Sequence, residues 1–80
     1  MTNGSEVLIW KQNKVAKKFI EVQATSPQSA KTYESLNIKY SRTFKNLLKK
    51  EVIKKTENKY YLDIKAWDKF RKSFKRLFLF

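Results

Sequence analysis

The sequence contains no cysteine and no histidine, and each absence excludes a class of chemistry. Without cysteine there is no disulfide framework, no thiolate metal site and no thiol nucleophile. Without histidine there is no imidazole metal ligand, no histidine general base and no serine–histidine triad. The seven acidic residues are scattered and form no spaced pair typical of a metal or acid–base site. We therefore expect a protein that is not an enzyme and holds no metal or cofactor.

Glycine and long apolar runs are also scarce. The single glycine, Gly4, excludes a glycine-rich phosphate-binding loop. No run approaches the roughly 20 apolar residues that a membrane-spanning helix needs, and the N-terminus has no basic leader. Because a lysine-rich chain without cysteine fits a reducing compartment, we expect a cytoplasmic protein, with the inner membrane surface as an alternative site.

Positive charge is what the sequence has in excess. Nineteen lysine and arginine residues are set against seven acidic residues among 80, which gives a formal net charge of +12. Residues 39–80 hold fourteen cations and four anions, whereas residues 1–38 hold five cations and three anions. An excess of this size favours binding to a polyanion, which is DNA, RNA or an anionic membrane surface.

Apolar spacing predicts two helices in the first half of the chain. Residues 6–23 follow helical periodicity. "ATSP" then ends this helix, because Ser26 is a favourable N-cap and Pro27 a favourable first helical residue. The second helix is expected over 27–36, and Asn37, which tolerates the left-handed conformation, begins the turn after it. The expected inward positions are Val15, Ala16, Phe19 and Ile20 in the first helix and Ala30, Tyr33 and Leu36 in the second.

The second half combines a helix, a hairpin and a last helix. Ser41 is expected to cap a third helix over 41–50. "VIKK" and "KYYL" are β-branched and aromatic, and "TEN" between them indicates a hairpin turn in which Asn58 tolerates positive φ. Asp63 is expected to cap a helix over 64–80. The inward positions are Phe44, Leu47 and Leu48 in the third helix, Ile53, Tyr60 and Leu62 in the hairpin, and Trp67, Phe70, Phe74 and Leu77 in the last helix.

Residues 25–63, "TSPQSAKTYESLNIKYSRTFKNLLKKEVIKKTENKYYLD", carry a resemblance to a known superfamily. The features are the "SP" start, the short turn before "SRTFKNLL", the "VIKK" strand and the "YYLD" exit. This stretch resembles the winged helix-turn-helix superfamily in its small prokaryotic DNA-binding form. The resemblance implies a winged helix-turn-helix domain over 6–63, with three helices and a β-hairpin wing. From the residues themselves we expect a flexible tail over 1–5 and an added C-terminal amphipathic helix over 64–80, so the predicted fold is mainly α.

The resemblance also implies that the third helix enters the major groove of double-stranded DNA. At about 100° per residue, Arg42, Asn46 and Lys49 lie opposite the apolar stripe of this helix. Arg42 suits a guanine edge and Asn46 an adenine edge, whereas the lysines suit phosphates. The alternative is an ordinary solvated basic face. The expected DNA contacts are Ser41, Arg42, Thr43, Lys45, Asn46, Lys49 and Lys50 in the helix, and Lys55 and Lys59 in the wing.

Other residues are expected to contact phosphates near this helix. The N-terminus of the second helix offers free backbone amides, although Ser26 acting only as a cap explains the same pattern. Tyr40 suits either the core or the DNA backbone. The possible phosphate contacts are Ser26, Gln28, Ser29, Lys31, Lys39 and Tyr40. We assign Trp10, Tyr33, Tyr60 and Tyr61 to the small core rather than to stacking with single-stranded nucleic acid.

The last helix leaves three alternatives open. Its apolar stripe packs on the first helix, pairs with a second copy of the chain, or lies on an anionic membrane between basic faces. The possible dimer or membrane contacts are Phe74, Leu77, Phe78 and Phe80. The leading hypothesis is a small DNA-binding transcriptional regulator, with a homodimer through this helix as one possible form. The alternative is a protein- or membrane-docking module that acts through the same helix.

Overall fold

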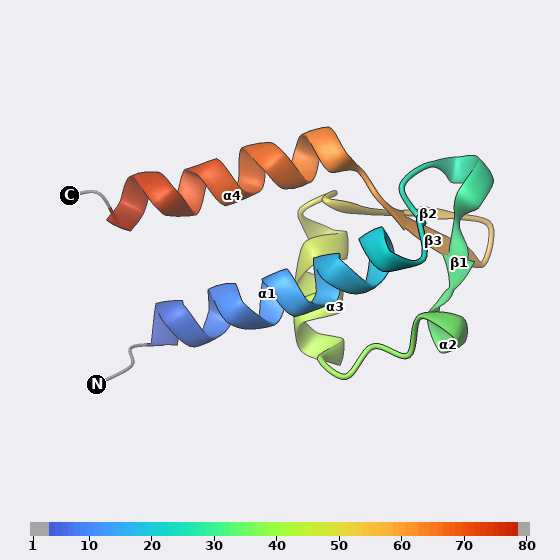
Figure 1. The fold of residues 1–80 in the computed structure, drawn as a ribbon, viewed down its shortest axis with the longest axis horizontal. Helices are drawn as coiled ribbons and strands as arrows, with labels where there is room; N and C mark the ends of the chain where they lie inside the picture. Colours follow the sequence, from blue (N-terminus) through green and yellow to red (C-terminus); the bar gives the residue numbers. More distant parts are fainter. Residues whose placement is uncertain (1–3, 79–80) are drawn as a thin grey trace.

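The computed structural model describes the backbone of residues 4–78 and the side chains of residues 8–72. These residues form an α+β fold of four α-helices and a three-stranded antiparallel sheet, drawn in Figure 1. The expectation of a mainly α fold with a two-stranded hairpin is corrected, because a third strand joins the sheet. In chain order the elements are α1 (Gly4–Glu21), the 3₁₀ turn η1 (Pro27–Ser29), β1 (Lys31–Thr32), α2 (Tyr33–Leu36), α3 (Ser41–Lys49), β2 (Ile53–Thr56), β3 (Lys59–Leu62) and α4 (Ile64–Phe78).

The first predicted helix is confirmed as α1, which begins at Gly4, two residues earlier than expected. Val15 and Phe19 are buried, as the periodicity predicts. Ile20, expected to face inward, is 48% exposed. The stripe that faces the core runs through Gln12, which is buried, and Ile20 lies at the edge of that stripe because each residue turns the helix by about 100°.

α1 and α3 end in the same hydrogen-bonded motif, although neither end has the glycine that usually closes it. Gln23 and Glu51 take left-handed φ angles of 58° and 63°. The amides of the next residues, Ala24 and Val52, donate to carbonyls five residues back at 2.8 and 3.0 Å. Each motif pairs the last helical carbonyls and turns the chain inward, so that Ala24 and Val52 are both buried.

The prediction of a second helix over 27–36 is wrong. The structure divides this stretch into η1, the strand β1 and the single turn of α2. Ala30, between η1 and β1, is extended with ψ of 148°. Thr32 caps α2 in place of Ser26, because its hydroxyl accepts a hydrogen bond from the amide of Ser35 at 3.3 Å. Pairing of β1 with a distant strand overrides the local helical spacing.

β1 pairs with β3, so the strand order in the sheet is β1-β3-β2, with both pairings antiparallel. The hairpin is confirmed, with Ile53 opposite Leu62 and both side chains fully buried. Thr56, expected in the turn, ends β2. The positive φ expected at Asn58 occurs instead at Glu57, where φ is 57°.

α4 begins at the predicted cap. Asp63 accepts a hydrogen bond from the amide of Ala66 through Oδ1 at 3.1 Å, and its carbonyl accepts from the amide of Trp67 at 2.8 Å. Trp67 is buried, and Phe70 packs against the core. The contacts expected at Phe74, Leu77, Phe78 and Phe80 lie outside the described side chains.

One hydrophobic core joins the helices to the sheet. α1 packs on α3 and on β3, and α3 packs on β2. Figure 1 shows the sheet at one end of the molecule, while the free ends of α1 and α4 lie at the other end. The buried members of the core are Val15, Ala16, Phe19, Ala24, Leu36, Phe44, Leu47, Val52, Ile53, Leu62 and Trp67.

Candidate nucleic-acid interface

The residues of α3 that face the core hold this helix in place. Leu47 is fully buried and Phe44 nearly so. The Phe44 ring meets the rings of Tyr33 and Tyr60 edge-on, with centroids 4.8 and 5.0 Å apart. It also stacks near Phe19, at 6.3 Å between centroids. These contacts tie α3 to α2, β3 and α1, so its outer face has a defined orientation.

The start of α3 differs from the prediction. Tyr40 is the N-cap, without a capping side chain, and Ser41 is the first helical residue and exposed. The amide of Phe44 donates to the carbonyl of Tyr40 at 2.9 Å, which closes the first turn. The Tyr40 ring packs edge-on against Trp10 at 5.7 Å between centroids, and this contact joins the start of α3 to α1.

We define the outer face of α3 as Arg42, Lys45, Asn46 and Lys49, all of which are exposed, as predicted. In the described part of the chain, none of the four takes part in a salt bridge or a side-chain hydrogen bond. α3 contains no acidic residue. Lys50, just beyond the helix, is exposed as well. The outer face therefore presents donors and positive charge that nothing within the described chain neutralises.

Thr43 is a correction to the expected DNA contacts, because it is only 4% exposed. It lies one helical turn from both Tyr40 and Leu47, at the edge of the buried stripe of α3. Its side chain is therefore part of the packed interior and is withdrawn from the candidate interface.

Two lysines of the hairpin, Lys55 and Lys59, are exposed and remain candidates for phosphate contact. The Nζ atom of Lys55 lies 5.9 Å from the centroid of the Tyr60 ring, a cation–π contact on the same sheet. Glu57 is exposed in the turn and adds a negative charge at the tip of the hairpin. The hairpin is thus suited to flank an anionic ligand along its strands rather than at its tip.

Lys54 is not free, because its Nζ atom donates to Oδ2 of Asp63 at 2.6 Å. This hydrogen bond holds the pKa of Asp63 below its ordinary value, and the amide of Ala66 acts in the same direction. The same hydrogen bond raises the pKa of Lys54. Both groups are therefore charged at neutral pH, and the pair joins β2 to the start of α4.

The phosphate site expected at the start of the second helix is not formed. η1 has only three residues, and the amide of Ser29 donates to the carbonyl of Ser26 at 3.1 Å. The hydroxyls of the same two serines are hydrogen-bonded to each other at 2.9 Å. Gln28 is exposed beside them. Lys31, also exposed, lies on β1 opposite Tyr60, so the structure brings it to the sheet instead.

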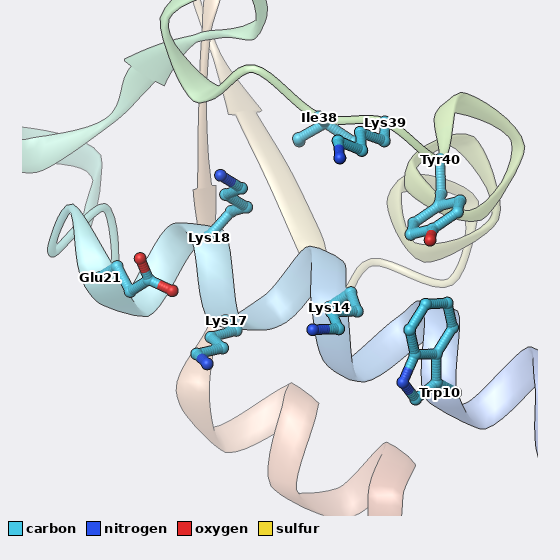
Figure 2. Close-up of a pocket in the computed structure, with 8 residues that line it drawn as sticks. All are labelled: Trp10, Lys14, Lys17, Lys18, Glu21, Ile38, Lys39 and Tyr40. Atoms are coloured by element: carbon cyan, nitrogen blue, oxygen red, sulfur yellow. The ribbon is translucent and has the colours of Figure 1, made fainter.

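Lys39 and Tyr40 line a groove of about 330 Å³ between α1 and residues 38–40, shown in Figure 2. The sequence reasoning missed this groove and placed Trp10 in the core, whereas Trp10 is 51% exposed. A signal was present, because the lining residues of α1 recur at helical spacing on one face. The lining residues are Trp10, Lys14, Lys17, Lys18, Glu21, Ile38, Lys39 and Tyr40.

Within the described residues, no group of three or more acidic side chains is placed to hold a metal ion. None of the helices in that part of the chain combines the length and the apolar character needed to cross a bilayer.

No protein-family model, curated protein or solved structure matches the chain. Evidence on function therefore comes from the chain's own surfaces.

Proposed function

We propose that the chain is a small winged helix-turn-helix protein of the cytoplasm that binds double-stranded DNA with α3 in the major groove, as a transcriptional regulator. Its order of elements supports this proposal. α2 and α3 are joined by residues 37–40, a connection of the length usual between the helices of a helix-turn-helix. The β2–β3 hairpin follows α3 directly, and in this proposal it would serve as the wing.

The observation that carries the proposal is the unneutralised outer face of α3. An α-helix with its side chains is about 10–12 Å wide, which fits a major groove about 12 Å wide. Arg42 and Asn46 lie one turn apart on this face and are both exposed. The Arg42 guanidinium suits the two acceptors of guanine, and the Asn46 amide suits the donor and acceptor of adenine.

Phosphate contacts would supply most of the affinity. Lys45, Lys49 and Lys50 are exposed on or beside α3, and Lys55 and Lys59 are exposed on the hairpin. Lysine suits this role because its ammonium is a flexible point charge that does not need the geometry of a base edge. Binding is therefore expected to fall steeply as the salt concentration rises.

The test of the proposal is charge reversal on the outer face, in the variant Arg42→Glu with Lys49→Glu. Both side chains are exposed and unpaired in the described chain, so the fold should be retained. Selection from a random duplex library at about 0.15 M salt, where exposed charges are partly screened, supplies the DNA site. Fluorescence anisotropy on that site should show an affinity lower by roughly 30-fold or more.

The matched control is Lys65→Glu with Lys69→Glu, which makes the same change in net charge on exposed positions of α4. A loss equal in both variants would mean that only net charge matters and that α3 does not read DNA. An enriched motif in the library would support a sequence-reading regulator, and a two-fold symmetric motif would indicate a dimer. No enrichment, together with binding abolished by salt, would contradict the proposal.

A second candidate function is docking on an anionic membrane or protein surface through α4. The observation in its favour is that Lys65, Lys69 and Arg71 are exposed on the described part of this helix and take part in no salt bridge there. For this function, charge reversal at Lys72, Lys75 and Arg76 should abolish binding to anionic liposomes. The Arg42 and Lys49 double variant should leave such binding unchanged.

A further inference from the structure

One end of the groove between α1 and residues 38–40 is aromatic, and its tryptophan lies outside the hydrophobic core. Trp10 and Tyr40 meet edge to face there, with centroids 5.7 Å apart and ring planes at 65° (Figure 2). Trp10 is 51% exposed and is not a member of the core cluster. An indole held by an aromatic neighbour and open to solvent is a stacking surface available to a planar ligand.

Lysine ammonium groups lie close to both of these rings. The Nζ atom of Lys14 lies 5.4 Å from the centroid of the Trp10 ring, and the Nζ atom of Lys11 lies 5.6 Å from that of Tyr40. Both distances are within the range of cation–π contacts. A planar ligand stacked on Trp10 would therefore meet an ammonium group close to the stacking face.

The middle of the groove is cationic. Figure 2 shows Lys14, Lys17 and Lys18 along α1, with Lys39 on the facing segment and Glu21 at the end opposite the aromatic pair. In the described part of the chain, none of these lysines takes part in a salt bridge. Several unneutralised ammonium groups around one concave site favour a ligand with more than one negative charge, and phosphate is such a group that lysine binds as a point charge.

The size of the groove narrows the class of ligand. A volume of about 330 Å³ is near the lower end for small-molecule sites, which suits a single nucleotide. Duplex DNA keeps its bases paired and stacked, so it cannot place one against Trp10. A nucleotide with an unpaired base fits both the aromatic end and the cationic part of the groove. Its base can stack on aromatic rings while the phosphates of the nucleotide contact lysines.

We propose that this groove binds a nucleotide unit, with its base stacked on Trp10 and its phosphates against Lys14, Lys17, Lys18 and Lys39. The unit is either a free nucleotide or one nucleotide of a single strand, since both offer the same chemistry. This site does not rest on the proposed function, because none of the four residues that define the outer face of α3 lines it.

The test is a titration followed by the two tryptophan indole N–H signals in the NMR spectrum of the whole chain. The probes are ATP, inorganic tripolyphosphate and a pentamer of thymidylate. The Trp10 signal should shift on adding ATP, whereas the signal of Trp67, which is 6% exposed, should stay in place. The variant Trp10→Phe assigns the two signals and, because it keeps an aromatic ring, should retain most of the affinity.

Two sets of variants separate stacking from charge. Trp10→Ala should weaken ATP binding by roughly five- to 150-fold, the range found when an aromatic stacking partner is removed. Lys17→Ala with Lys18→Ala should weaken it by about two- to 30-fold, as expected for two exposed charge contacts. The matched control, Lys65→Ala with Lys69→Ala, removes the same charge from α4 and should change the affinity much less.

The comparison of probes decides the outcome. Tighter binding of ATP than of tripolyphosphate, lost in Trp10→Ala, supports the site, and the relative affinities of ATP and the pentamer identify the source of the nucleotide. Equal binding of ATP and tripolyphosphate, unaffected by Trp10→Ala, would show only a basic patch and overturn the proposal. A Trp10 signal that shifts with neither ATP nor the pentamer would overturn it too.

Arg42→Glu with Lys49→Glu should leave ATP binding unchanged. Failure of the nucleotide-site proposal can therefore be distinguished from failure of the DNA-binding proposal.

Discussion

The outer face of α3 and the groove beside Trp10 are both basic, but they differ in shape and in side-chain chemistry. The outer face is convex, comes from one helix and carries Arg42 and Asn46 beside lysines. The groove is concave, comes from α1 and the segment before α3, and combines Trp10 and Tyr40 with lysines. Two surfaces with the same sign of charge therefore offer different shapes and different side-chain chemistry.

Charge alone would not distinguish these two surfaces. Arginine and asparagine offer planar donor and acceptor groups that match base edges in an intact duplex. Tryptophan and lysine offer a ring face and a point charge, which match the face of an unpaired base and its phosphate. A net charge of +12 favours an anionic partner, and under the two proposals the local geometry of each surface would decide which part of a nucleic acid it contacts.

The two surfaces also depend on the core in different ways. The outer face requires only that α3 is helical and held from within by Phe44 and Leu47. The groove requires that α1 and residues 38–40 keep their separation, which Ile38 supports by packing against the core and the Trp10–Tyr40 contact supports at the surface. Changes that loosen α3 should affect both surfaces, whereas changes at Trp10 should affect only the groove.

The largest expected effect is that of Leu47→Ala, which should break both surfaces together. Leu47 is fully buried between α3 and the rest of the core. Removing a buried leucine side chain costs about 2–5 kcal/mol, a large part of the roughly 4–12 kcal/mol typical of a chain of this size. Urea unfolding should show this loss, and both duplex and ATP binding should weaken.

The control for this variant is Lys45→Ala, an exposed change on the same helix that should alter the free energy of unfolding by no more than about 0.5 kcal/mol. Unchanged ATP binding in Leu47→Ala, with stability lost, would contradict the shared dependence of the two surfaces on α3.

A smaller effect is expected for the salt dependence of the two affinities, for duplex DNA and for ATP, and it compares the two surfaces directly. Five phosphate contacts would lower duplex affinity by roughly 500-fold between about 50 and 200 mM salt. ATP affinity should fall far less over the same range, because stacking on Trp10 is not screened by salt. Anisotropy for the duplex and NMR titration for ATP measure the two slopes, and parallel slopes would contradict a stacking contribution in the groove.

The smallest expected effect is at Asp63, which belongs to neither surface. Asp63→Ala should lower the free energy of unfolding by about 1 kcal/mol, because α4 loses its N-cap. Asp63→Asn should cost less, since asparagine also caps helices well. Affinity for both ligands should be unchanged at neutral pH, which would show that a modest loss of stability by itself does not disturb either surface.

The pH dependence of stability gives a second readout for the same pair. The pKa of Asp63 is lowered in the folded protein, so its contribution is present above about pH 4 and is lost as the pH falls through the folded value. The pKa of Lys54 is raised, so its contribution is present below about pH 10.4 and is lost as the pH rises further. Thermal unfolding of Asp63→Asn should show a flatter acid limb, and an unchanged limb would contradict the role of this pair.

Local patterns predicted the elements whose sequence signals lie between residues close in the chain. The stripes of α1 and α3, the Asp63 cap and the β-branched and aromatic strands of the hairpin were readable because each signal comes from residues close in the chain. The exposed face of α3 followed from the same periodicity, and Thr43 was misplaced because it lies at the edge of the buried stripe. The left-handed residues Gln23 and Glu51 were not readable, since neither is the glycine that usually marks such a position.

The sequence by itself determined the net charge, the helical stripe of α3 and the chemistry available on its outer face. Tertiary structure alone decided that residues 31–32 form a strand, because the hydrogen bonds that favour it come from β3, far along the chain. It also decided that Trp10 stands beside Tyr40 at the edge of a basic groove. A spacing rule records which residues share a face of one element, but the meeting of two elements depends on how the whole core packs.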